Sequence, residues 1–142
     1  MKSKLNHIAI FVLFFGFKQN KFKEIKILIK RIFKNLFNNF KVDFYIIENN
    51  SKKYDKKKNK YSNVLLGDNS CFDFSGWDSA LEQLKNKRKL KKYDFICFAN
   101  DTFINRNYTS GLFLKNFNKK KLPKIDKFSA IGFLDDFPKT TY

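Results

Sequence analysis

The chain has 142 residues, and its 43% hydrophobic share, which includes 19 phenylalanines, is enough to fill one domain core and excludes a disordered protein. We therefore expect a single domain over residues 1–142. The formal net charge is +17, yet nearly all of the 30 basic residues are lysine, whereas reading of base edges and grip on phosphates favour arginine. Solvated charge that follows from composition is the favoured interpretation, and a functional basic surface is the alternative.

The chain's cysteines and its one histidine argue against a zinc site or a redox dithiol. Cys71 and Cys97 have no CxxC spacing, and His7 is far from both in the sequence. Cys97 lies inside an apolar run. We expect two reduced, buried thiols.

The first half of the chain predicts a strand, a helix and a second strand. Residues 7–16 form the most hydrophobic run, which a buried parallel strand explains better than a signal peptide, since no small-residue cleavage site follows. Apolar residues at three- and four-residue steps predict an amphipathic helix from about 20 to 40. A lysine stripe runs beside its apolar face, at Lys23, Lys26, Lys30 and Lys34. Residues 42–51 read as the next strand.

The second half continues the alternation of strands and helices. A lysine-rich connector (52–62) precedes a short strand at 63–69, and Ser75 is the expected N-cap of the helix that follows. The sequence "YDFICFANDTF" (93–103) predicts a buried strand through residues 95–99. A helix within 106–122 and a fifth strand within 127–138 complete the pattern.

This order predicts an α/β fold: a three-layer, Rossmann-like sandwich with a mainly parallel sheet. Right-handed crossovers place helices on both faces, and ligands bind at the carboxyl ends of the strands, where the strand order reverses. The expected strands after the first end on polar residues, at 48–51, 67–69, 100–102 and 135–136.

The chemistry of these polar ends is oxygen-rich. Neither GxGxxG after the first strand nor GxxxxGK[ST] anywhere is present, which argues against the common dinucleotide and P-loop classes. One carboxylate at a strand end, Asp101, suits Mg²⁺ or Mn²⁺ shared with a diphosphate. From these residues alone, however, an ordinary Asn-Asp-Thr turn is the favoured interpretation, and the metal site is the alternative.

Two segments in order, "GDNSCFDFSGWDSALEQL" and "YDFICFANDTF", resemble bacterial glycosyltransferases of the GT-A fold, of the family-2-like and rhamnan-synthesis type. The resemblance covers almost the whole chain, but only as the amino-terminal, nucleotide-sugar half of such an enzyme. It implies transfer from a nucleoside diphosphate sugar to a cell-surface polysaccharide or a lipid-linked acceptor. The acceptor-binding half, which relatives place next, is expected to be missing, and no residue is assigned as the catalytic base.

The resemblance also implies site residues. Asn49 would lie near the nucleobase or ribose, and Asp68, Asn69 and Asp73 would line the donor, with Gly76 allowing close approach. Asp101 would face the divalent cation or the diphosphate. Ala99 stands where the fuller Asp-x-Asp element has its first acid. The structural alternatives are a turn at Asn49 and a residue that merely precedes a helix at Asp73. Trp77 is expected in the core, and a stacking platform for the ligand is the alternative at that position.

The expected location is the cytoplasm, with peripheral contact at the inner face of an anionic membrane through the lysine-rich helix. The rival function is a basic binding module for anionic membrane or nucleic acid without catalysis. Nucleic acid is the less favoured partner, because the aromatic residues fall at core-like spacings and do not interleave with arginines.

Overall fold

The computed structural model describes residues 6–50, 54 and 60–102. They form the strands β1 (His7–Phe14), β2 (Lys41–Glu48), β3 (Val64–Leu66) and β4 (Phe95–Asn100), and the helices α1 (Phe22–Ile32), α2 (Lys34–Asn39) and α3 (Phe72–Asn86). Short 3₁₀ turns, η1 (Gln19–Lys21) and η4 (Leu90–Lys92), precede α1 and β4. The expected helix within 106–122 and the expected strand within 127–138, with Asp135 and Asp136, lie outside the described residues.

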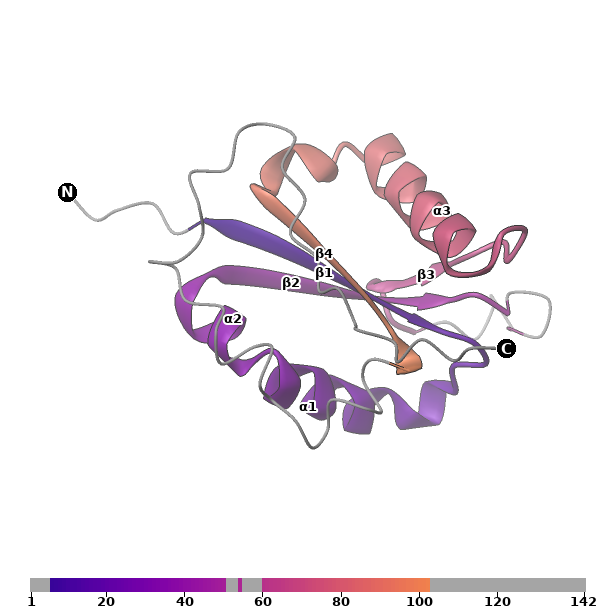
Figure 1. Ribbon diagram of the computed structural model, residues 1–142, viewed down its shortest axis with the longest axis horizontal. Helices are drawn as coiled ribbons and strands as arrows, with labels where there is room; N and C mark the ends of the chain where they lie inside the picture. The colour runs from indigo at the N-terminus through magenta and orange to yellow at the C-terminus, as the bar shows by residue number, and fades with distance from the viewer. Residues whose placement is uncertain (1–5, 51–53, 55–59, 103–142) are drawn as a thin grey trace, which may run out of the picture.

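The four described strands form one sheet in the order β3-β2-β1-β4, and every pairing is parallel. Helices α1 and α2 lie on one side of this sheet and α3 lies on the other (Figure 1). The predicted α/β class, with helices on both faces of a parallel sheet, is thus confirmed for this part of the chain.

The central strand β1 shows why the sequence selects this arrangement. Seven of its eight residues are buried, as expected for a strand covered on both faces. Side chains alternate across a strand, so Ile8, Ile10 and Val12 face α1 and α2, whereas Phe11 and Leu13 face α3. One apolar run therefore supplies both halves of the core.

The helix expected from 20 to 40 is divided in the structure. Phe33, at φ −93° and ψ 22°, leaves helical geometry between α1 and α2. Its side chain is only 1% exposed, so it packs into the core at the junction. The spacing of apolar residues in the sequence continues through this position, so it did not indicate the break.

The expectation that Ser75 caps a helix was wrong. Helix α3 begins at Phe72, and Ser75 lies in its first turn, where its hydroxyl accepts a hydrogen bond from the Cys71 amide (2.9 Å) and donates one to the Phe72 carbonyl (3.1 Å). Asn69 and Phe72 both adopt positive φ (53° and 48°) on the way into the helix. Residues other than glycine rarely do so, and such conformations cost on the order of 1 kcal/mol or more.

Strand β4 is less buried than its sequence suggests. Ile96 and Phe98, on the α3 side, are 41% and 42% exposed, because α3 lies over β1, β2 and β3. Cys97 faces the other layer and is half-buried, whereas Cys71 is exposed, which contradicts the expectation of two buried thiols. Among the described residues, no helix is both long and apolar enough to span a membrane.

Candidate functional site

The carboxyl ends of β1 and β4 meet at the point where the strand order reverses. From β1 the chain moves outward to β2 and β3, and it then returns through α3 to β4 on the other side of β1. Asp101 follows β4 directly, and its carboxylate accepts a hydrogen bond from the Phe15 amide, 86 residues away (3.4 Å). The predicted cation-facing residue therefore lies at the switch point, where open α/β sheets bind ligands.

Asp73 is brought to the same edge of the sheet. It lies in the first turn of α3, and its carboxylate accepts a 2.8 Å hydrogen bond from the side-chain amide of Asn100, the last residue of β4. This bond connects the helix to the residue immediately before Asp101. Asp73 is thus bound to the residue that directly precedes Asp101 in the chain.

Asn49 and Asn69 form a second cluster at this edge. The Asn49 side chain is buried, and its amide nitrogen donates to the Asn69 side-chain oxygen (3.0 Å) and to the Phe72 carbonyl (2.9 Å). Its oxygen accepts the Asn69 backbone amide (3.1 Å). These bonds fix the course of the loop between β3 and α3, so Asn49 acts on this loop from beneath it. Contact between Asn49 and a ligand stays a prediction.

Gly76 permits this cluster to form. A Cβ on Gly76 would lie 2.8 Å from the Asn49 side-chain oxygen and would clash with a methyl group of Leu13. Gly76 therefore allows these two protein side chains to pack closely against α3. The close approach of a donor at Gly76 stays a prediction.

Asp68 is the most exposed of the predicted carboxylates. Its side chain accepts hydrogen bonds from the Ser70 amide and the Ser70 hydroxyl, both at 3.0 Å. The Ser70 amide, together with the Ser75 and Ser70 hydroxyls, lowers the pKa of Asp68 below its ordinary value of 3.8. At neutral pH this carboxylate is ionised at the protein surface.

Glu48 is a buried residue of this edge that the sequence analysis did not single out. Only 2% of it is exposed, and its carboxylate accepts hydrogen bonds from the Gly16 amide (3.0 Å) and the Asn50 amide (2.6 Å). Gly16 has a φ of 91°, a conformation that favours glycine. Glu48 therefore sets the shape of the loop after β1. A carboxylate at the last position of an apolar strand was the available signal.

The carboxylates of this edge do not form a dense metal centre. Within residues 6–50, 54 and 60–102, no three His, Cys, Asp or Glu side chains come close enough together to hold a metal ion. Asp101, which belongs to no such group of three among these residues, fits a cation whose other ligands come from a diphosphate and from water. It does not fit a cation held by protein alone.

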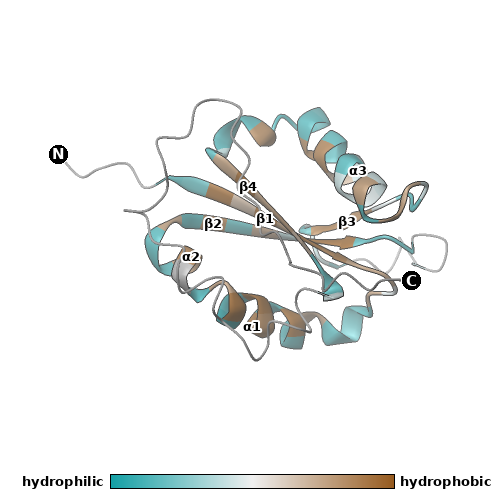
Figure 2. Cartoon of the chain, in the orientation of Figure 1, coloured by the Kyte–Doolittle hydropathy of each residue, from teal (hydrophilic) through white to brown (hydrophobic). Residues whose placement is uncertain are grey.

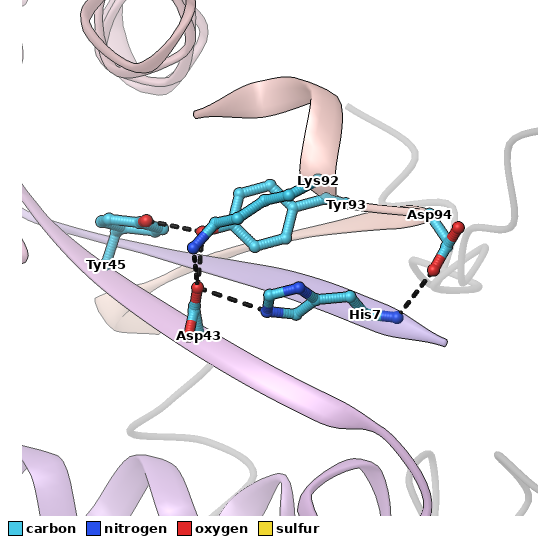
Figure 3. A network of polar contacts seen from close by, with 6 residues as sticks. All are labelled: His7, Asp43, Tyr45, Lys92, Tyr93 and Asp94. Carbon is cyan, nitrogen blue, oxygen red and sulfur yellow. Dashed lines mark hydrogen bonds and ion pairs between the residues drawn. The ribbon is translucent and has the colours of Figure 1, made fainter. Parts of the chain in front are cut away.

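A second polar network lies at the opposite, amino ends of the strands (Figure 3). The Tyr93 hydroxyl donates to Asp43 (2.8 Å), so the neighbouring Tyr45 hydroxyl, 2.6 Å away, donates to Tyr93 in turn. Lys92 binds the same Asp43 oxygen, and the His7 Nε2 atom lies 3.3 Å from it. The network ties η4 to β1 and β2.

The network changes the acidity of two of its members. Burial alone would raise the pKa of Asp43, but hydrogen bonds from Lys92 and Tyr93 and the positive charge of Lys92 hold it below 3.8. Burial, followed by the bonds to Tyr45 and Asp43, raises the pKa of Tyr93 well above 10. At neutral pH, Asp43 is therefore charged and Tyr93 is a neutral donor.

The Tyr93-Asp94 pair at the start of the second motif thus has a structural role. While Tyr93 binds Asp43, Asp94 accepts the His7 amide through its carboxylate and donates its own amide to the His7 carbonyl, both at 2.8 Å. This pair sets the register between β4 and β1. An open hollow of about 300 Å³ lies beside the network, at the end of the sheet opposite to Asp101. It is lined by Val42, Asp43, Phe44, Tyr45, Ser62, Asn63 and Lys89.

Comparison with known proteins gives this geometry no family assignment. No family model, no curated protein and no solved structure matches the chain.

Proposed function

We propose that this chain is the donor-binding domain of a glycosyltransferase of the GT-A type, which takes a nucleoside diphosphate sugar and serves transfer to a polysaccharide or a lipid-linked acceptor. The observation that carries the proposal is the hydrogen bond between Asp101 and the Phe15 amide at the reversal of strand order. It supports the proposal because a diphosphate bound at a switch point lies beside the loop after the first strand.

In this proposal the residues at the carboxyl ends of the strands have different roles. Asp101 holds a divalent cation together with the diphosphate, and the cation neutralises the charge that develops on the leaving group. Asp68, Asn69 and Asp73 contact the ribose or the sugar. Asn49 and Gly76 keep the β3–α3 loop in place beneath them.

Isothermal titration tests the proposal with uridine, guanosine and thymidine diphosphate sugars, each with and without Mn²⁺. We expect at least one of these donors to bind in a Mn²⁺-dependent manner. Asp101→Asn retains an oxygen that can accept the Phe15 amide, so it is expected to fold while weakening Mn²⁺-dependent binding about tenfold or more. Glu82→Gln removes an exposed carboxylate from α3 and serves as the matched control. If folded protein binds none of these donors, or if both variants bind like wild type, the proposal is wrong.

A further inference from the structure

Helix α1 and the first residue of α2 carry a continuous band of positive charge on their outward side. We name this band the basic face; its cations are Lys23, Lys26, Lys30 and Lys34, and all are exposed. The one acidic residue of α1, Glu24, is bound by Lys21, whose Nζ atom lies 3.0 Å from each carboxylate oxygen. Lys21 thus offsets the single negative charge within the band.

A large apolar side chain lies in the middle of these cations. Ile27 is 68% exposed, although the other side of α1 buries Phe22 and Ile29 against the sheet. At 100° per residue, Ile27 lies between Lys23, one turn before it, and Arg31, one turn after it. Hydrophilic and hydrophobic residues alternate along α1, which lies on the outside of the molecule (Figure 2). The core therefore uses one side of this helix and leaves Ile27 in solvent.

We propose that the basic face docks on an anionic lipid bilayer, with Ile27 entering the boundary between headgroups and acyl chains. Phosphate and carboxylate headgroups complement the four lysines, and each Lys or Arg near such a surface strengthens binding about fivefold. Transfer of an exposed isoleucine from water into that boundary is favourable because apolar surface is buried. Contact with a phosphodiester backbone would bury little of that surface. The charge complements lipid and nucleic acid alike; Ile27 favours lipid.

The mode of docking follows from the packing of α1. An interfacial helix usually buries its whole apolar side in the membrane, but here that side is already covered by the sheet. The contact is therefore mainly electrostatic, with one inserted side chain, and it is reversible and weakened by salt. The docking surface is separate from the switch point, so it does not require glycosyl transfer.

Vesicle co-sedimentation of the full chain tests the proposal with phosphatidylcholine alone and with about 30 mol% phosphatidylserine added. We expect binding only to the anionic vesicles. Lys23→Gln/Lys30→Gln should reduce the partition coefficient about 25-fold, on the basis of about fivefold per cation. Ile27→Gln should reduce it several-fold without changing the dependence on salt, because it removes no charge. All three positions are exposed, so folding is expected to be retained, and circular dichroism checks it.

The matched control is Lys87→Gln/Lys91→Gln, which removes two lysines that are also exposed but lie after α3, on the other layer of the molecule. We expect it to change binding by less than about twofold. An equal loss in both double variants would show that binding follows total charge and would overturn the proposal. The proposal would also be overturned if Ile27→Gln bound anionic vesicles as strongly as the wild type. Binding of the wild type to a DNA duplex but not to vesicles would overturn it too.

Discussion

The Asn49 side-chain oxygen lies 2.8 Å from the position that a Cβ on Gly76 would occupy. The buried side chain of Asn49, directly after β2, therefore occupies the space that a side chain at Gly76 in α3 would need. The same amide binds the loop that carries Asp68 and Asn69. Packing between sheet and helix and the shape of the candidate donor site are thus coupled at this point.

Gly76→Ala is expected to lower the free energy of unfolding by about 1–3 kcal/mol, although alanine is the better helix former. The added methyl group has to displace Leu13 or the hydrogen-bonded Asn49. Urea unfolding followed by circular dichroism measures the change. Asp78→Ala, at an exposed position of the same helix, should stay within about 0.5 kcal/mol of wild type. A Gly76→Ala protein as stable as wild type would show that α3 is not held this closely.

Asn49→Ala is expected to loosen the β3–α3 loop as well as to lower stability. It leaves the Asn69 amide and the Phe72 carbonyl without the side chain that binds them, at a cost of about 1–3 kcal/mol for each group that stays dry. Chymotrypsin should then cleave faster after Phe72 and Phe74, which are already exposed. Asn20→Ala, at an exposed amide, is the control. Unchanged cleavage would mean that the loop is held by other contacts.

The acid stability of the protein should depend on Asp43. Because its folded-state pKa is lowered, its contribution to stability is present above the ordinary value of 3.8 and is lost as the pH falls through the lowered pKa. The stability difference between wild type and Asp43→Asn is therefore expected to be largest above about pH 5 and to narrow toward pH 2–3. Urea midpoints across this range provide the measurement. Asp78→Asn controls for the loss of one exposed negative charge, and a gap that stays constant across the range would refute the assignment.

The two thiols should react at very different rates. Burial raises the pKa of Cys97 to about 11 from an ordinary value of 9.0, so at pH 8 its thiolate fraction is about a hundredfold smaller than that of an unperturbed thiol. Cys71 is exposed. Titration with a chromogenic disulfide should show one fast and one slow thiol, and Cys71→Ser should remove the fast phase alone. Two fast thiols in the native protein would contradict the packing of β4.

The positions of the strands were predictable from the sequence because each strand is a run rich in apolar residues, and those after the first are followed by turn-forming or polar residues. The predicted positions differ from β1, β2, β3 and β4 by only a few residues at their ends. Local patterns of this kind are the most reliable signal in a single sequence.

The details that shape the candidate site depend on contacts distant in sequence, which no local pattern contains. The beginning of α3 at Phe72 is held by Asn49, 23 residues earlier, so a search for a local cap selected Ser75 instead. Asp43 and Tyr93, 50 residues apart, meet only when η4 reaches the amino ends of β1 and β2. Asp73 and Asp101 lie at one edge because the strands of the sheet are parallel. The hydrogen bond from Asn100 to Asp73, by contrast, could be seen only in the structure.

The position of β1 between β2 and β4 also affects how the chain folds while it is being synthesised. Its partner Phe95 is synthesised 87 residues after Ile8, which at typical ribosomal speeds is a delay on the order of 10 s. During this interval one edge of the most hydrophobic strand has no native neighbour, and such edges pair with other chains. We therefore expect the nascent polypeptide to need chaperone protection until residue 100 has left the ribosome, and to fold slowly for its size.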